Sequence, residues 1–264
     1  MPFLDALYAT LYYDLFAQDI TTSTVAVPSQ TLLLLHGFAG TPESDFTAQL
    51  PNLRTQYNVL APHLHGYGLS SHRDAYNVSY YREDVADIIS LLDALNLDTV
   101  RVLGFSDGGI VGLLLTALHP QRVEALAVLG AQPTINAKDV AAIRYWLLEK
   151  PLSEERQKEL AQLHGDLYWR SLPGMYVKVQ EDLVANGGIL ISDKDLAAIR
   201  CPTLIMHGKR DRIVSADYAR ILHEHIPDSH LLLFDAGHAA HLRCEQEYTA
   251  TVTRFFSDPQ RFVL

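Results

Sequence analysis

Cysteine is scarce in this chain of 264 residues, and its first fifth lacks positive charge altogether. The two cysteines, Cys201 and Cys244, are too few for a disulfide scaffold and do not form a metal-type pair. No Lys or Arg precedes Arg54, so the basic region of a secretory signal and the arginines of a transit peptide are both missing. The longest apolar segment, 108–118, is far shorter than the roughly 20 residues that span a bilayer. These absences predict a cytoplasmic protein that is not inserted in a membrane.

Positive charge is also in deficit over the whole chain, where 21 Lys and Arg face 31 Asp and Glu for a formal charge of −10. Nucleic acids and anionic membranes bind clustered Lys and Arg, so we expect neither as a partner. The 48% of hydrophobic residues is enough for a large core and excludes a disordered chain. The sequence gives no indication of the oligomeric state.

Short apolar runs ended by Gly, Pro or Asp are typical of strands that are covered on both faces. Six such strands are predicted, at 31–35, 57–62, 99–104, 123–129, 203–207 and 230–234. Helical patterns lie between them, at 85–95, 108–119, 215–226 and 244–256. This alternation predicts an α/β fold with a mostly parallel, doubly wound sheet. The segment 7–16 fits either an edge strand or a helix.

One segment, 132–196, interrupts the alternation because it contains no convincing strand. Its apolar patterns predict helices near 137–150, 153–164 and 167–184. Ligands of open α/β sheets bind at the carboxyl edge of the strands, so we expect this insertion to form a helical lid there. The predicted organisation is a core of residues 1–131 and 197–264 with a lid of residues 132–196. Trp146, Trp169 and Met175 are candidates for its pocket.

The segment Gly104-Phe105-Ser106-Asp107-Gly108 matches Gly-x-Ser-x-Gly and joins a predicted strand to a predicted buried helix. A nucleophile elbow requires this context, because only small residues beside the strained turn let strand and helix approach each other. We therefore predict that Ser106 is a nucleophile. The alternative is a glycine-rich turn in which Ser106 only caps the helix.

A serine hydroxyl needs a base, and the base needs an orienting carboxylate. In elbow enzymes these residues follow in the order Ser, acid, His. Asp211 follows the strand 203–207 and His238 follows the strand 230–234, so we predict them as the acid and the base. His241 is an alternative base and Asp235 an alternative acid.

The tetrahedral intermediate of acyl transfer also needs hydrogen-bond donors for its oxyanion. The loop His36-Gly37-Phe38-Ala39-Gly40 follows the first clear strand, and the elbow turn offers a second N–H. We predict the backbone N–H groups of Phe38 and Asp107 as the oxyanion hole. The alternative for the first loop is a plain strand-to-helix turn.

These motifs together resemble the serine hydrolases of the α/β-hydrolase fold and, more narrowly, the valacyclovir hydrolase (biphenyl-hydrolase-like) family. The narrower resemblance runs from about residue 31 to the C-terminus and is carried by several segments, namely Thr41-x-Glu43-x-Asp45-Phe46, Gly-x-Ser-Asp-Gly-Gly at 104–109, Cys201-Pro202 and Gly237-His238-x-x-His241-Leu242-Arg243. It implies a cofactor-free enzyme that prefers esters of α-amino acids. One segment departs from the family pattern: His63 and His65 stand where Asp and Arg are usual.

Asp107 is the most informative residue beside the predicted nucleophile. Its carboxylate opposes the charge of the oxyanion by roughly 2–3 kcal/mol at about 6 Å and an effective dielectric constant of about 20. A substrate with an α-ammonium group would offset that opposition, and the resemblance gives Asp107 this binding role. The alternative is that Asp107 only favours the positive end of the helix, for about 0.3–1 kcal/mol.

The twelve histidines invite a metal hypothesis, centred on His63 and His65 with His36 and His72. Two histidines on one loop fall short of a zinc ligand set, so no metal is predicted. The favoured function is a serine esterase acting on a small-molecule ester that carries an α-ammonium group. A carbon–carbon bond hydrolase, a cofactor-free perhydrolase and a non-catalytic hydrolase-like receptor stay open as alternatives.

Overall fold

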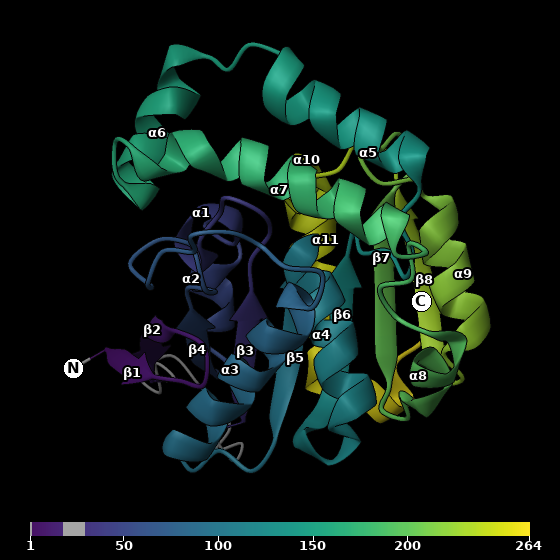
Figure 1. Ribbon diagram of the computed structural model, residues 1–264. Coiled ribbons are helices and arrows are strands. Elements are labelled where there is room, and N and C mark those ends of the chain that lie inside the picture. Colours follow the sequence, from purple (N-terminus) through teal and green to yellow (C-terminus); the bar gives the residue numbers. More distant parts are fainter. Residues whose placement is uncertain (1, 18–29) are drawn as a thin grey trace.

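The computed structural model describes residues 2–17 and 30–264, and within these ranges eight strands form one sheet (Figure 1). Their spatial order is β1-β2-β4-β3-β5-β6-β7-β8. The order of β3, β4 and β5 places the first parallel strand between the two that follow it, so the chain winds in both directions from the centre. This arrangement confirms the predicted α/β class with a doubly wound sheet.

The six parallel strands lie where the sequence predicts them, with ends shifted by at most one residue. They are β3 (Thr31–Leu35), β4 (Asn58–Pro62), β5 (Val100–Phe105), β6 (Val123–Leu129), β7 (Thr203–Gly208) and β8 (Ser229–Phe234). Strand β3 is buried along its whole length, and its leucines alternate between the two faces of the sheet. Leu33 and Leu35 join the core on one face, while Leu32 and Leu34 join the core on the other.

The N-terminal segment is strand rather than helix. Strand β1 (Phe3–Asp5) pairs antiparallel with β2 (Thr10–Phe16), and β2 pairs antiparallel with β4. This hairpin forms one edge of the sheet, which resolves the ambiguity of the segment 7–16.

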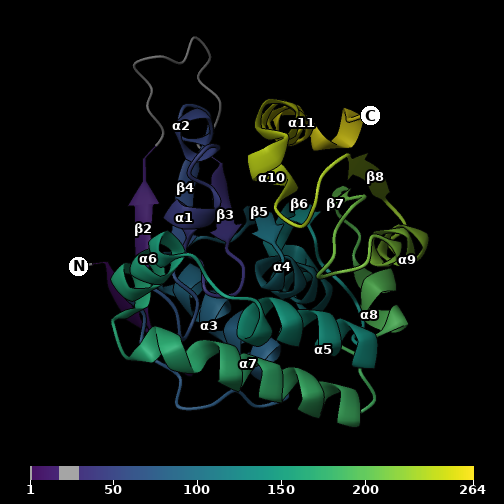
Figure 2. The same cartoon turned by 90° about the horizontal axis from the view of Figure 1, so that it is seen from above.

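Helices cover both faces of the sheet, as Figure 2 shows from above. One face carries α3 (Tyr80–Ala94), α4 (Asp107–Leu118), α8 (Asp193–Ala198) and α9 (Asp217–His225). The other carries α1 (Pro42–Asp45), α2 (Leu50–Leu53), α10 (Ala240–Arg243) and α11 (Glu245–Ser257). Helix α4 is buried from Asp107 to Ala117, which agrees with its apolar sequence.

The segment between β6 and α8 forms helices that cross above the carboxyl edge of the sheet (Figure 1). Helix α5 (Ala137–Arg144) continues as a π-helical turn over Tyr145–Glu149 and is followed by α6 (Glu154–His164) and α7 (Tyr168–Ala185). These elements occupy the three predicted helical ranges. The predicted boundary at residue 196 falls inside α8, which packs against α4 and α9.

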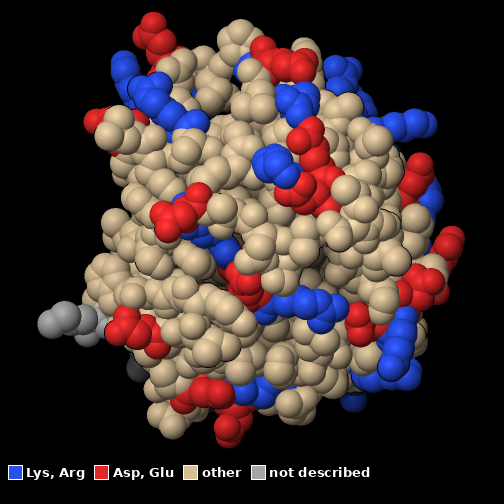
Figure 3. Space-filling model, viewed as in Figure 1, with Lys and Arg blue, Asp and Glu red and all other residues tan. Residues whose placement is uncertain are grey.

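Charged residues of both signs are mixed on the face seen in Figure 3, where Lys and Arg stand among Asp and Glu. In the part of the chain that the structure describes, none of the helices combines the length and the apolar character required to cross a bilayer.

Candidate active site

Ser106 occupies a strained turn between β5 and α4. Its φ of 52° and ψ of −119° are unusual for a residue with a side chain. The flanking glycines are required by space: a Cβ on Gly104 would lie 2.5 Å from the Gly108 carbonyl oxygen, and one on Gly108 would lie 2.1 Å from that of Leu35. The Gly-x-Ser-x-Gly segment therefore forms the sharp elbow that its pattern predicts, and Ser106 makes no side-chain cap to the helix.

The structure brings the three predicted triad residues together. Nε2 of His238 lies 3.0 Å from Oγ of Ser106, and Nδ1 of His238 lies 2.6 Å from Oδ2 of Asp211. The imidazole packs over Gly130, where a Cβ would lie 3.1 Å from the ring. The residue after β6 thus leaves room for the imidazole between the elbow and the acid.

The carboxylate of Asp211 is fully buried and held from several sides. Its Oδ1 accepts hydrogen bonds from the N–H groups of Ile213 and Val214, at 2.8 and 3.0 Å. Nε2 of His207 lies 3.1 Å from Oδ2. Burial alone would raise the pKa of Asp211, but the bonds from His207, His238 and the backbone outweigh it and lower that pKa below its usual value. Asp211 is therefore suited to remain ionised beside His238.

The two alternatives for acid and base lie elsewhere. His241 belongs to α10, and its buried ring packs against Phe105 with the centroids 4.4 Å apart. Burial lowers the pKa of His241 to about 4, and Ser106 bonds to His238 instead. Asp235 is exposed and pairs with Arg210 at 3.1 Å.

The loop after β3 carries the first predicted oxyanion donor. Asp45 fixes this loop, because its Oδ2 accepts a hydrogen bond of 2.8 Å from the N–H of Gly37. Burial raises the pKa of Asp45 to about 6. Among the described residues, no backbone carbonyl in a loop or turn accepts a hydrogen bond from the N–H group of Phe38 or of Asp107. The N–H group of Asp107 belongs to the first turn of α4, where N–H groups have no acceptor within the helix. Both are thus available to an oxyanion.

The side chain of Asp107 lies in the wall of the cavity beside Ser106 and is buried, with 6% of its surface exposed. Its Oδ1 accepts hydrogen bonds from the hydroxyls of Tyr81 and Tyr176, at 2.9 and 2.7 Å. Its Oδ2 is buried and has no hydrogen-bond partner within residues 2–17 and 30–264. Burial raises the pKa of Asp107 to about 6, against the opposite effect of the two tyrosine bonds. This carboxylate therefore holds an acceptor that none of the described residues fills.

The cavity above Ser106 measures about 140 Å³. Its walls combine the catalytic candidates with apolar side chains from the core and the insertion, among them Ile110, Ile143, Trp146, Leu147, Ile213 and Val214. Gln132 also lines it, with a buried Oε1 that has no partner. Of the three pocket candidates, Trp146 reaches this cavity and Trp169 lines a smaller neighbouring one of about 90 Å³. Met175 lines neither.

Comparison with known proteins matches residues 30–172 to the alpha/beta hydrolase fold. The chain belongs to the α/β-hydrolase fold family. It is similar to human serine hydrolase BPHL, with 29% identity over 91% of this chain and 88% of that protein. It is also similar to a 2-hydroxy-6-oxo-2,4-heptadienoate hydrolase of Pseudomonas putida, with 26% identity over 86% and 88% of the two chains. These matches confirm the predicted fold and the resemblance to the biphenyl-hydrolase-like family.

A solved structure supports the same fold. The 2-hydroxy-6-oxo-6-phenylhexa-2,4-dienoate hydrolase from Rhodococcus sp. strain RHA1 superposes with a TM-score of 0.81 at 21% identity, covering 97% of this chain and 98% of that one. Relatives named for different activities thus share the architecture, so the site must decide the chemistry.

The side chain of His63, which stands where Asp is usual, is held by hydrogen bonds at both ring nitrogens. Nδ1 of His63 accepts a hydrogen bond of 3.0 Å from the N–H of Leu69, so Nε2 carries the proton and donates to Oε2 of Glu43 at 3.0 Å. Nε2 of His36 accepts from the N–H of Leu64 at 2.9 Å, and burial lowers the pKa of His36 to about 3. Both histidines therefore act as acceptors within the loop.

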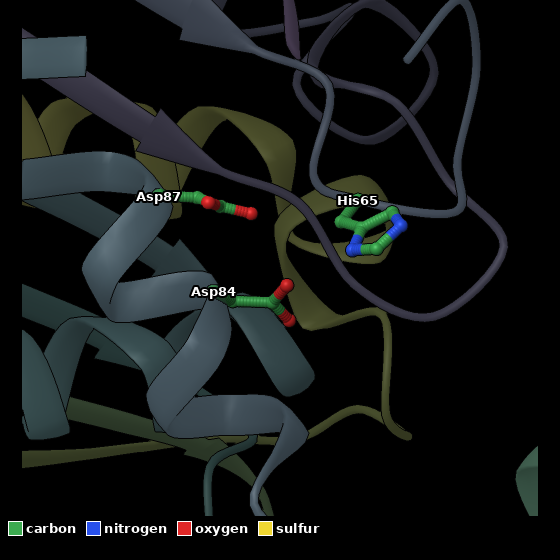
Figure 4. Close-up of side chains that lie close together, drawn as sticks. All are labelled: His65, Asp84 and Asp87. Atoms are coloured by element: carbon green, nitrogen blue, oxygen red, sulfur yellow. The ribbon is translucent and has the colours of Figure 1, made fainter. Parts of the chain in front are cut away.

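A second cluster brings His65 within 4.8 Å of Asp84 and Asp87 through ligand-type atoms. Figure 4 shows the two carboxylates of α3 and the imidazole pointing toward one another. Burial raises the pKa of Asp84 to about 7 and that of Asp87 to about 6, while burial and the charge of Arg73 lower that of His65 to about 4. The guanidinium of Arg73 donates to Asp84, and its Nε donates to the carbonyl of His65 at 3.0 Å. The guanidinium of Arg73 thus provides a positive charge beside the two carboxylates.

Three residues that surround the predicted site have no signal in the sequence. Tyr81 and Tyr176 are 26 and 69 positions away from Asp107, and His207 sits at the end of a strand like many structural histidines. Only the folded arrangement of α3, α7 and β7 reveals their contacts.

Proposed function

We propose that this α/β hydrolase cleaves carboxylic esters of α-amino acids. The observation that carries the proposal is the buried carboxylate of Asp107, directly after the nucleophile, with one oxygen filled by two tyrosines and the other unpartnered. A buried acceptor without a donor is costly, and a charged one more so. A substrate ammonium group supplies both the missing donor and the opposite charge.

The proposed mechanism uses the Ser106–His238–Asp211 arrangement. Nε2 of His238 takes the hydroxyl proton as Oγ of Ser106 attacks the ester carbonyl. Asp211 accepts the hydrogen bond from Nδ1–H of His238 and stabilises the imidazolium that forms. The N–H groups of Phe38 and Asp107 receive the oxyanion. His238 then protonates the leaving alcohol, and the same steps with water release the amino acid and restore Ser106.

The charge of Asp107 also favours a substrate with an ammonium group. An ionised Asp107 about 6 Å from the oxyanion opposes it by roughly 3 kcal/mol at an effective dielectric constant of about 20. An ammonium group bound to that carboxylate cancels the opposition. Because an ammonium has three N–H donors, the second buried and unpartnered acceptor of the cavity, Oε1 of Gln132, fits the same ligand.

We propose that residues 132–196 act as a lid over this site. Trp146 and Leu147 of the π-helical turn and Tyr176 of α7 line the cavity, so the insertion forms much of its outer wall. Apolar walls on this side favour apolar groups on the substrate.

The decisive test compares the ethyl ester of phenylalanine with that of N-acetylphenylalanine. We expect kcat/KM to be about 10- to 100-fold higher for the free amine near neutral pH. Asp107→Asn should abolish this preference, because it slows the amino ester and removes the charge that opposes the oxyanion of the acetylated one. Equal kcat/KM for the two esters in the unmodified protein contradicts the proposal.

A second candidate, a carbon–carbon bond hydrolase, is favoured by the names of relatives such as the heptadienoate hydrolase of Pseudomonas putida. A dienoate substrate carries a carboxylate, which the ionised Asp107 would repel in the cavity. Loss of the absorbance of a 2-hydroxy-6-oxo-dienoate on adding the protein, retained in Asp107→Asn, would establish that function instead.

A further inference from the structure

Asp107 receives its two tyrosine hydroxyls from different layers of the fold. Tyr81 lies on α3, which packs on the face of the sheet, and Tyr176 lies on α7, which crosses above the carboxyl edge (Figure 1). Both side chains are buried, with 4% and 7% of their surface exposed. Both hydroxyls donate to the same oxygen, Oδ1, at 2.9 and 2.7 Å.

This double donation determines which oxygen a substrate can use. A carboxylate oxygen offers two lone-pair sites, and the two hydroxyls fill both sites of Oδ1. Oδ2 keeps its full accepting capacity. The two bonds come from side chains on different helices, α3 and α7, and together they hold Oδ1 in place and leave Oδ2 as the free oxygen.

The same bonds favour the charged form of Asp107. Hydrogen bonds donated to an ionised carboxylate stabilise it, whereas burial destabilises it. Both effects act on Asp107, with burial the larger and the bonds of Tyr176 and Tyr81 opposing it.

We infer that Tyr81 and Tyr176 are positioning residues for the ammonium site, which keep Asp107 ionised at neutral pH and leave Oδ2 as its single free acceptor. The role in substrate selection rests on the proposed function. The effect on the carboxylate itself does not, because both hydroxyls bond directly to Asp107.

Other charged and titratable groups also act on Asp107 and must stay constant in a test. They lie on the loop before α3, on α3 itself and after β8, and comprise Tyr67, Arg73, Tyr76, Tyr80, Asp84 and His238. Conservative Tyr→Phe changes at positions 81 and 176 leave all of them in place.

The test is a carboxyl ¹³C NMR titration of Asp107, with its resonance assigned by its absence in Asp107→Asn. We expect a midpoint near pH 6 in the unmodified protein. Tyr81→Phe and Tyr176→Phe should each move it to higher pH by about one unit, and the double variant further. Tyr218→Phe is the matched control, since it removes a tyrosine–aspartate bond to Asp139 and leaves Asp107 untouched.

The acidic limb of kcat/KM for the phenylalanine ester should move with the NMR midpoint, whereas kcat/KM for the acetylated ester should not rise as Asp107 ionises. An unchanged midpoint in the double variant, with the melting temperature confirming a folded protein, overturns the inference. A shifted midpoint without any preference for the amino ester upholds the effect of the tyrosines on Asp107 and contradicts the proposed function instead.

Discussion

Nε2 of His207 lies 3.1 Å from Oδ2 of Asp211, the same oxygen that accepts the hydrogen bond from His238. This nitrogen is also 3.0 Å from the carbonyl oxygen of Val214, which can only accept, so Nε2 carries a proton. Two imidazoles therefore converge on one carboxylate oxygen, one from β7 and one from the loop after β8.

Replacing His207 tests how much the proposed acid depends on this second imidazole. His207→Leu removes a donor from Asp211, and we expect kcat to fall about tenfold with little change in KM. His207→Gln keeps an N–H donor and should recover most of the activity. Equal activity of the Leu and Gln variants would show that the second bond has no effect on catalysis.

The strain at Ser106 makes a prediction about stability. A side chain at φ 52° and ψ −119° is unfavourable, whereas glycine adopts such angles freely. The free energy of unfolding of Ser106→Gly should therefore exceed that of Ser106→Ala by about 1 kcal/mol, after the entropy cost of glycine is subtracted. Urea unfolding of the two variants measures this difference. Both variants should lose esterase activity and labelling by a fluorophosphonate. Equal stability of the two would contradict strain at the elbow.

Asp107→Asn should lower activity on the amino ester and raise the free energy of unfolding by an amount that depends on pH. The pKa of Asp107 is raised in the folded protein to about 6 from its ordinary 3.8, so the folded state binds more protons than the unfolded one between these values. Stability from this group therefore falls as pH rises through that window. Relative to the unmodified protein, the variant should gain at most about 3 kcal/mol by pH 8 and nothing near pH 4. Urea unfolding at several pH values measures this difference, and a pH-independent one would contradict the raised pKa.

His164 joins the insertion to two loops of the core. Its Nδ1 accepts from the N–H of Gly68 at 2.9 Å, and its Nε2 lies 3.2 Å from the carbonyl oxygen of Ala39. Burial lowers its pKa to about 4, so the ring stays neutral and stability from this group is lost as pH falls from about 6.5 toward 4.

His164→Leu leaves the buried N–H of Gly68 without its acceptor and leaves the carbonyl oxygen of Ala39 with Arg156 alone, at 3.4 Å. We expect a loss of about 2–4 kcal/mol in urea unfolding. Because Ala39 follows Phe38, kcat should fall as well. His223→Leu, at an exposed histidine of α9, serves as the control and should change neither quantity by much. A fully active and stable His164→Leu would show that the link is dispensable.

The core strands and the elbow were predictable because their signals are local in the sequence. Apolar runs determine β3 to β8, and the glycines beside Ser106 are demanded by contacts within a few residues or with one neighbouring strand. Asp211 and His238 followed from their places after parallel strands, whose carboxyl ends share one edge. The segment 7–16 stayed ambiguous because its partner, β4, lies about 45 residues further along the chain.

The surroundings of the site were not predictable from the same reasoning. The contacts of Asp107 with Tyr81 and Tyr176 depend on how α3 and α7 pack, and no periodicity encodes which hydroxyl meets which carboxylate. The contact between His63 and Glu43 likewise depends on the geometry of two loops, and no local pattern in the sequence indicates it.

The buried histidines and aspartates described above have a joint consequence for proton linkage. Folding lowers the pKa of one set, which is His36, His65, His164 and His241. It raises the pKa of another, which is Asp45, Asp84, Asp87 and Asp107. On folding, the first set releases protons and the second takes them up, over ranges of pH that overlap between about 4 and about 6. The two sets act in opposite directions, so their contributions to the proton exchange that accompanies folding oppose each other in mildly acidic conditions.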